Sequence, residues 1–126
     1  MKQIHTNKLP QAIGSYSQAM LVENGTLYCS GQIGLHPQTG ELAFGIEFQA
    51  KQIMENIQAL IEELGYSLEN ICKTTLYLTD MNDFKIVDEI YGSFFGKHKP
   101  TRSTVAVSQL PKNALVEIEV IAYKKS

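Results

Sequence analysis

Arg102 is the only arginine in the chain, and every other cationic side chain is a lysine. A guanidinium is planar, always charged and able to hold a carboxylate through two parallel hydrogen bonds, whereas an ammonium acts as a point charge. A chain that uses lysine everywhere else has placed its one arginine for that geometry. We therefore predict that Arg102 binds a carboxylate; the alternative is a salt bridge between subunits, where arginine is also favoured.

Two glutamates, Glu117 and Glu119, interrupt an almost wholly apolar segment at residues 114–122. Side chains two positions apart in a strand point to the same face, so the two carboxylates lie side by side. A carboxylate held on such a face can act as a general base. The alternative is that both belong to a solvated strand face.

Length and composition predict one ordinary globular domain over residues 1–126. The chain is 44% hydrophobic and 19% charged, without the polar bias of disordered sequences. Its formal net charge of −2 and pI near 5.9 give no electrostatic footprint for a phosphate backbone. We expect no nucleic-acid partner on this ground.

Cysteine and histidine spacing gives no sign of a metal site. Cys29 and Cys72 lie far apart in apolar segments, and we expect both to be reduced core residues. His5, His36 and His98 show no ligand spacing. The N-terminus has no apolar signal region and no stretch approaches ~18 apolar residues, so we expect no membrane segment and a cytoplasmic location.

The hydrophobic pattern predicts a β-rich start followed by a helix, a strand, a helix and two strands. The first helix spans residues 44–64, with Gly65 just beyond its end, and the second runs from a cap at Asp80 or Asn82 to about Phe95. We place strands at residues 4–8, 17–23, 26–33, 70–79, 102–108 and 114–123, and a loop at residues 11–16. Asn24-Gly25 predicts a type I′ hairpin turn, in which both residues have positive φ.

Two helices can cover only one face of such a sheet, yet the last strand is apolar on both faces. Val116, Ile118 and Val120 lie on one face, and Leu115, Ile121 and Tyr123 lie beside the glutamates on the other. An apolar second face without a helix to cover it indicates burial against another subunit. We predict an α+β domain with both helices on one face of a mixed sheet, assembled as a symmetric homo-oligomer.

Five segments together resemble the RidA/YjgF (Rid) family of reactive-intermediate deaminases. They are AIGSYSQA at residues 12–19, SGQI at 30–33, MNDF at 81–84, PTRSTV at 100–105, and LPK at 110–112 with VEIE at 116–119. The resemblance runs along the whole chain in the right order. It implies a chorismate-mutase-like fold, a homotrimer whose sheets form a central barrel, and clefts between subunits. It also implies cofactor-free hydrolysis of 2-imino and enamine acids, such as 2-aminoacrylate, 2-iminobutanoate and 2-iminopropanoate, to 2-keto acids and ammonia.

The resemblance also implies roles for individual residues. Arg102 matches the arginine that holds the substrate carboxylate, and Glu117 matches the glutamate that positions water, which leaves Glu119 as a solvated residue. Tyr16 matches a tyrosine of the active site; the alternative is that it has only a packing role, as an amphipathic side chain in the pocket wall. The remaining matches are pocket residues: Ser30, Gly31, Phe84 and Thr104, the last of which contributes mainly backbone where many members have cysteine.

Three residues depart from the family pattern. Ser15 replaces a proline, which frees φ in the loop that places Tyr16. Thr101 replaces an alanine. Asp88 replaces an asparagine near the cleft, where a carboxylate competes for Arg102 and repels an anionic substrate by ~1 to 4 kcal/mol, unless it faces solvent.

Imine hydrolysis makes modest chemical demands, because imines hydrolyse in water unaided. A catalyst need only concentrate the anion, polarise the C=N carbon and deliver a water molecule, for which one carboxylate clamp and one base suffice. Two other functions remain open. The same clefts of a trimer can bind a carboxylate metabolite without turnover, in a regulatory role, or the protein can act on RNA, a function to which the acidic balance is poorly suited.

Overall fold

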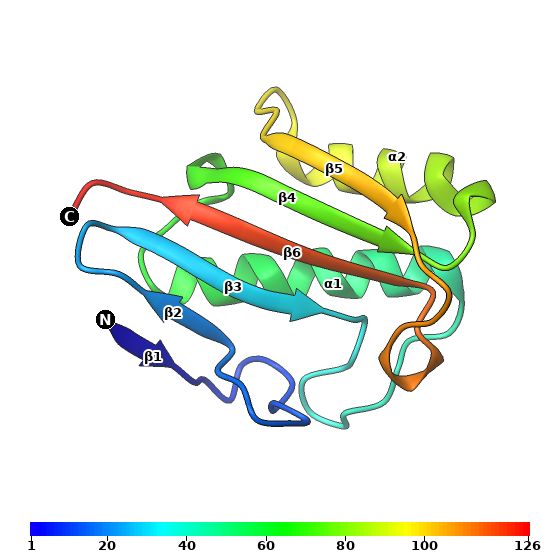
Figure 1. The fold of residues 1–126 in the computed structure, drawn as a ribbon, viewed down its shortest axis with the longest axis horizontal. Coiled ribbons are helices and arrows are strands. Elements are labelled where there is room, and N and C mark those ends of the chain that lie inside the picture. The colour runs from blue at the N-terminus through cyan, green and yellow to red at the C-terminus, as the bar shows by residue number, and fades with distance from the viewer.

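The computed structural model describes all residues, 1–126, as an α+β fold with a six-stranded mixed sheet (Figure 1). The elements in chain order are β1 (Lys2–Ile4), β2 (Ala19–Leu21), β3 (Thr26–Gln32), α1 (Gly45–Glu63), β4 (Ile71–Leu78), α2 (Phe84–Phe95), β5 (Thr101–Ala106) and β6 (Val116–Tyr123). Their spatial order is β1-β2-β3-β6-β4-β5. All neighbours are antiparallel except β4 and β5, which are parallel.

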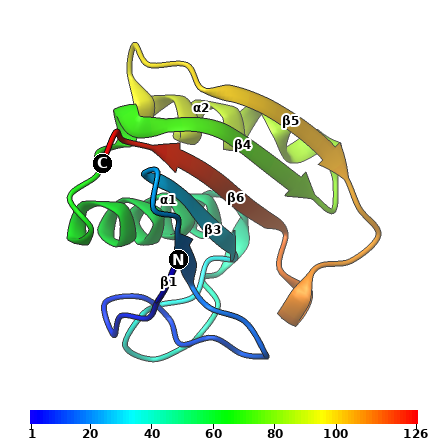
Figure 2. The ribbon, with the colours of Figure 1, turned by 60° about the vertical axis from the view of Figure 1, so that its left-hand side comes forward.

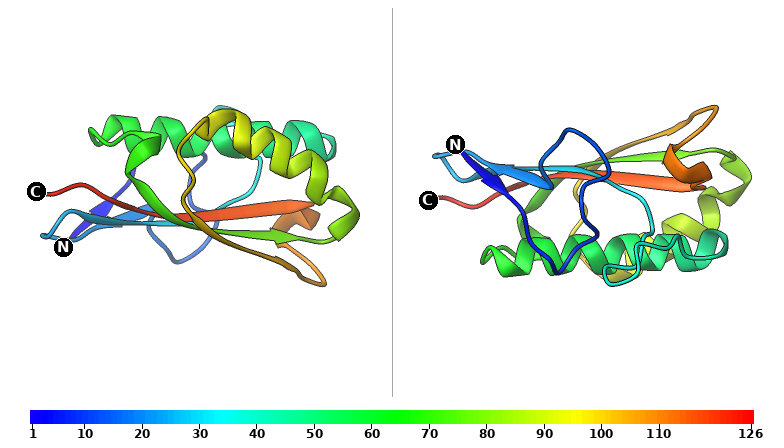
Figure 3. Two further views of the ribbon diagram at one scale, coloured as in Figure 1. Left: turned by 90° about the horizontal axis from the view of Figure 1, so that it is seen from above. Right: turned by 90° about the horizontal axis from the view of Figure 1, so that it is seen from below.

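Both helices pack on the same face of the sheet, as predicted (Figure 3). The core forms between the buried faces of α1 and α2 and alternate residues of the central strands. These core residues include Ile53, Ile57, Leu60 and Ile61 of α1, Val87, Tyr91 and Phe95 of α2, and Val116, Ile118, Val120 and Ala122 of β6. Neither helix is both long and apolar enough to cross a membrane.

The opposite, open face of the sheet has no helix to cover it (Figures 2 and 3). Tyr28 of β3 and Tyr123 of β6 are about half exposed on it, at 51% and 47%. Glu117, Glu119 and Ile121 alternate with the buried residues of β6 and are partly exposed. The prediction that both helices cover one face and leave the other uncovered is therefore confirmed, and the uncovered face carries both apolar side chains and the two glutamates.

The first hairpin forms where predicted, but its turn is not of type I′. Gly25 has φ 98°, whereas Asn24 does not have positive φ. The amide of Val22 donates to the carbonyl of Thr26, so three residues lie in the loop instead of two. The Asn24 side chain accepts from the Thr26 amide at 2.9 Å, which supplies the turn's polar contact. Only glycine fits at residue 25, because a Cβ there would lie 1.8 Å from the carbonyl oxygen of Lys124.

The first strand ends earlier than the predicted range of 4–8. β1 pairs with β2 only as far as Ile4, opposite Ala19. The buried side chain of Gln18 then occupies both backbone groups of Thr6: its Oε1 accepts from the amide at 2.6 Å and its Nε2 donates to the carbonyl at 3.1 Å. Because this side chain takes the place of a neighbouring strand, the ladder stops.

The prediction that both cysteines lie in the core is correct for Cys29 and wrong for Cys72. Burial raises the pKa of the Cys29 thiol to about 12. Cys72 is exposed, because the pairing of β4 with β6 shifts register between Ile71 and Lys73 and leaves Cys72 as the extra residue of a bulge.

Candidate functional site

Arg102 lies on β5, which is an edge strand of the sheet, and its side chain lies on the helix side. The guanidinium carbon is 5.2 Å from the centre of the Phe84 ring and 5.1 Å from that of Tyr91, both on α2. The Tyr91 hydroxyl is 2.8 Å from Thr74 Oγ1, which fixes the ring, and burial raises the pKa of this phenol. Two aromatic contacts therefore hold the guanidinium in one orientation.

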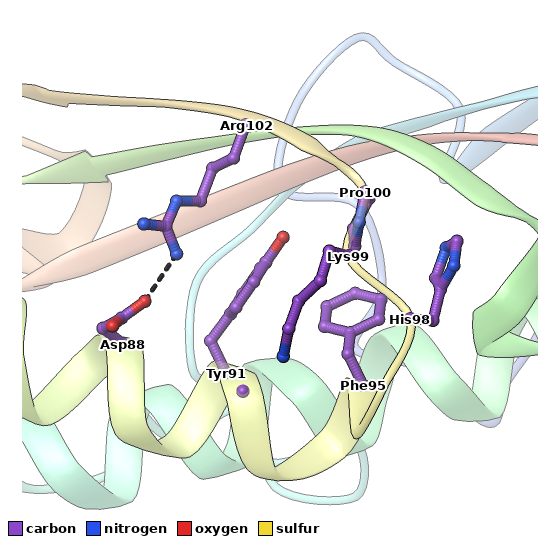
Figure 4. Close-up of a pocket in the computed structure, with 8 residues that line it drawn as sticks. Asp88, Tyr91, Phe95, His98, Lys99, Pro100 and Arg102 are labelled. Atoms are coloured by element: carbon purple, nitrogen blue, oxygen red, sulfur yellow. Dashed lines mark hydrogen bonds and ion pairs between the residues drawn. The ribbon is translucent and has the colours of Figure 1, made fainter.

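Asp88 lies between the two rings on the same face of α2, since residues at i, i+4 and i+7 share a helical face. Arg102 Nη1 donates to Asp88 Oδ1 at 2.6 Å (Figure 4). The Arg102 side chain is 26% exposed and that of Asp88 47%. Asp88 thus contacts the arginine instead of facing only solvent, and the ion pair forms within the chain. Both residues line a cavity of about 410 Å³ between α2 and residues 98–102.

Thr104 follows Arg102 on the same face of β5. Its hydroxyl oxygen is buried and has no hydrogen-bond partner in the chain. An unpaired buried hydroxyl costs about 1–3 kcal/mol. The strand therefore carries a free polar group next to its arginine.

The other predicted site residues gather on the open face around Glu117, in a second cavity of about 360 Å³. This cavity is lined by Ile13, Tyr16, Ser30, Gly31, Ile33, Pro111, Glu117 and Glu119. Four of the eight are residues predicted from the sequence. They come from the loop at residues 11–16, from the end of β3 and from β6.

A β-bulge builds the floor of this second cavity. The register between β3 and β6 shifts between Cys29 and Gln32, so Ser30 and Gly31 together lie opposite Glu119. Ser30 Oγ donates to the carbonyl of Ser17 at 2.6 Å, which ties the preceding loop to the strand.

Gly31 makes room for the glutamate, because a Cβ at this position would lie 1.9 Å from Glu117 Oε2. Any larger residue would displace the carboxylate. The choice of glycine at residue 31 and the position of Glu117 therefore depend on each other.

Tyr16 is positioned by its own loop. Its hydroxyl accepts from the amide of Ile13 at 3.3 Å, and its amide donates to the carbonyl of Gly14 at 3.0 Å. The ring is 44% exposed at the rim of the cavity. Ser15, which replaces the family's proline, is exposed in this loop, and these two hydrogen bonds close the turn without the rigid proline ring.

The two glutamates differ in their surroundings. Burial, and secondarily the charge of Glu119, raise the pKa of Glu117 above its ordinary value. Glu119 accepts a hydrogen bond from the Tyr77 hydroxyl of β4 at 2.7 Å. Glu119 is therefore not a simply solvated residue, which corrects the sequence-based interpretation.

Sequence reasoning missed Tyr77 and Gln49. Gln49 is buried in α1, and its Oε1 accepts from the amide of Leu115 at 2.9 Å, two residues before Glu117, so it fixes the start of β6. Tyr77 alternates with the buried Leu76 and Leu78 of β4 and therefore lies on the open face. No local pattern identifies its partner, because Glu119 lies 42 positions further along the chain.

The two cavities share no residue and open on opposite sides of the sheet. Arg102 contacts α2 on the helix side, whereas Glu117 alternates with buried Val116 and Ile118 and so faces the open side. Within one chain the arginine and the glutamate cannot contact one small molecule together.

No three His, Cys, Asp or Glu side chains come together in a way that could hold a metal ion.

Comparison with known proteins finds one family along nearly the whole chain. The family model described as endoribonuclease L-PSP matches residues 6–124. A RutC family protein from Pyrococcus horikoshii is 50% identical over 123 residues, covering 97% of each chain. A rat protein named 2-iminobutanoate/2-iminopropanoate deaminase is 45% identical over 122 residues, covering 96% of this chain and 88% of the rat protein.

The fold comparison agrees with the sequence comparison. The crystal structure of RidA from Psychrobacter sp. PAMC 21119 superposes with a TM-score of 0.95 at 44% identity, covering 98% of this chain and all of that one. The sheet order and the placement of both helices on one face are those of this fold. The chain belongs to the RidA/YjgF family, the family of the endoribonuclease L-PSP model.

Proposed function

We propose that this protein is a hydrolase that converts 2-imino and enamine carboxylic acids to 2-keto acids and ammonia, without a cofactor. The observation that carries the proposal is the only arginine of the chain, whose guanidinium is held between Phe84 and Tyr91 at the edge of a cavity. A fixed guanidinium is suited to orient a carboxylate through two hydrogen bonds. The rat relative is named for the deamination of two such imino acids.

The working site requires a second subunit. Because Arg102 and Glu117 lie on opposite sides of the sheet, the arginine of one chain must meet the glutamate of another. The uncovered apolar face and the free edge of β5 supply surfaces for such an assembly. We propose a homotrimer with three sites, each built where two subunits meet.

In this site Arg102 holds the carboxylate, and Glu117 of the adjacent subunit takes a proton from a water molecule. The water oxygen bonds to C2 of the imine, and the nitrogen receives a proton. In the resulting carbinolamine the hydroxyl proton is transferred to the nitrogen, the C–N bond breaks to release ammonia, and the C2 carbonyl forms. No electrons are gained or lost, so the residues present suffice for the reaction.

The other predicted residues shape this site. Tyr16, Ser30 and Gly31 surround Glu117, whereas Phe84 and Thr104 lie on the side of Arg102.

A second candidate function is carboxylate binding without turnover, which the ion pair between Asp88 and Arg102 favours. A substrate must displace the Asp88 carboxylate before it can use the guanidinium fully. The chain's net charge of −2 is poorly suited to a phosphate backbone, which argues against the ribonuclease activity for which the family model is named.

A coupled assay tests the proposed activity. A pyridoxal-phosphate dehydratase generates the imine from an amino acid, and release of the keto acid is followed with and without this protein. An accelerated release supports the hydrolase, whereas an unchanged rate combined with measurable carboxylate binding supports the second candidate.

Mixing inactive subunits tests the shared site. Arg102→Ala and Glu117→Gln chains are each inactive alone, but a hybrid trimer contains sites in which both residues are wild type. Activity should therefore reappear on mixing and reassembly. An active monomer in analytical ultracentrifugation would refute the shared site.

A further inference from the structure

We propose that Tyr77 and Glu119 are positioning residues for Glu117: the tyrosine holds the Glu119 carboxylate in place beside Glu117, and Glu117 is the group that exchanges a proton in the cavity. The assignment extends the proposed hydrolase and rests on it for its catalytic consequence. The arrangement itself is visible in the pairing of β4 with β6.

Tyr77 lies directly opposite Glu117 in the β4–β6 ladder, and Thr75 lies opposite Glu119. The Tyr77 hydroxyl nevertheless donates to the diagonal residue, Glu119, with 2.7 Å between Oη and Oε1. Diagonal cross-strand neighbours are within reach of long aromatic side chains. Of the two carboxylates on this face, the phenol is therefore hydrogen-bonded only to Glu119.

A phenol that donates to a carboxylate stabilises the ionised carboxylate. The converse effect is seen on the tyrosine: the hydrogen bond to Glu119 raises the pKa of Tyr77, with burial as a further cause. The phenol therefore stays protonated and remains a donor. Its hydrogen bond holds the Glu119 carboxylate in one position beside Glu117.

Glu117 has the opposite environment. It is half-buried, Gly31 packs against its carboxylate, and no donor in the chain bonds to it. Burial, and then the charge of Glu119, raise the pKa of Glu117. Two carboxylates in one cavity with unlike surroundings take unlike roles, one as a fixed charge and one as the group that accepts and returns a proton.

No other charged side chain of the chain lines this cavity. Tyr16 approaches from the loop before β2, and Ser30 and Gly31 of β3 carry no charge. In the proposed assembly Arg102 of the neighbouring subunit faces Glu117 from the other side and acts in the opposite direction. Glu119 is thus the one group on the same chain that disfavours the ionised form of Glu117 by its charge.

Two variants separate the parts of the proposal. Glu119→Gln removes the charge and keeps the shape, and Tyr77→Phe removes the donor. If Glu117 is the base, kcat/KM should fall as the pH is lowered, because Glu117 then takes up a proton. Glu119→Gln should move this fall in kcat/KM to lower pH, and Tyr77→Phe should move it in the same direction by less.

Matched controls guard against a general structural effect. Tyr28→Phe removes a phenol from the same open face, and Glu55→Gln removes an exposed carboxylate from α1, far from the cavity. Both should leave the fall in kcat/KM at the same pH. Circular dichroism and thermal unfolding of all four variants establish that they are folded.

A direct titration distinguishes failure of this inference from failure of the proposed function. Carbon-13 NMR of the Glu117 side-chain carboxyl reports its protonation whether or not the protein turns over an imine. A lower titration midpoint in folded Glu119→Gln supports the inference even if the protein is no enzyme. An unchanged midpoint in both variants, or an equal shift in the controls, overturns it.

Discussion

Arg102 and Asp88 form an ion pair in which Nη1 and Oδ1 are 2.6 Å apart, so the arginine proposed to hold the substrate already holds a carboxylate of its own chain. The pair is partly exposed, which limits its strength to about 0.2–1 kcal/mol. A substrate can displace such a weak contact, but the contact still lowers the affinity of the substrate for Arg102. We therefore expect Asp88 to determine how readily Arg102 accepts a ligand.

Replacing Asp88 with asparagine should tighten substrate binding. The amide oxygen can still accept from the guanidinium but no longer repels an anion, so KM for an imino acid should fall by roughly two- to five-fold. Glu89→Gln, an exposed neighbour on α2, is the matched control and should leave KM unchanged. A weaker-binding Asp88→Asn would show instead that Asp88 orients the arginine productively.

Replacing Arg102 with lysine should abolish most activity while the fold is retained. Lysine keeps the charge but loses both the bidentate hydrogen bond to a carboxylate and the contacts of the planar guanidinium with the Phe84 and Tyr91 rings. We therefore expect a loss of about 100-fold in kcat/KM. Thermal unfolding and Lys85→Arg, an exposed change on α2, serve as controls. Near wild-type turnover by folded Arg102→Lys would contradict the assignment of Arg102 as the carboxylate clamp.

The two glutamates should differ in their effect on rate. Glu117→Gln removes the proposed base, and we expect a loss of about 100-fold or more in kcat with substrate binding largely kept. Glu119→Gln should be mild at neutral pH. Steady-state kinetics of both variants measure the ranking, and the reverse order would mean that Glu119 is the base.

The substitution Gly31→Ala should displace the Glu117 side chain without unfolding the protein. The new Cβ would lie 1.9 Å from Glu117 Oε2, the end of a side chain that can rotate away. A misplaced base should lower kcat/KM by about 100-fold. In a Glu117→Gln background the same change should cost far less, since no base remains to be displaced. Equal losses in both backgrounds would place the effect of Gly31 elsewhere.

Glu117 should also make stability depend on pH. The pKa of Glu117 is raised in the folded protein, so folding favours the protonated carboxyl. The resulting contribution to the free energy of unfolding is fully present below the unfolded-state pKa and is lost as pH rises through the folded-state pKa. Glu117→Gln should therefore raise the free energy of unfolding at neutral pH, and the gain should vanish below about pH 4. Denaturant unfolding at a fixed protein concentration measures it. A gain that is the same at both pH values would point to packing.

The sequence by itself determined both helices and the last three strands, and it singled out the residues that we propose for the site. The spacing of apolar residues placed α1 and α2, and Gly65 and Gly96 lie just beyond their ends with positive φ. Alternation placed β4, β5 and β6 within a few residues. These signals are local, because a helix or a strand exposes its periodicity within a single segment of the chain.

Only the tertiary structure decided which side chains meet. Asp88 and Arg102 lie on different elements, and so do Tyr77 and Glu119; each pair forms because packing and strand register bring the two residues together. The bulge at Ser30 and the early end of β1 likewise depend on partners distant in the sequence. A local pattern fixes the face on which a side chain lies, but the residue that it contacts there depends on how the strands pair and on which helix covers them.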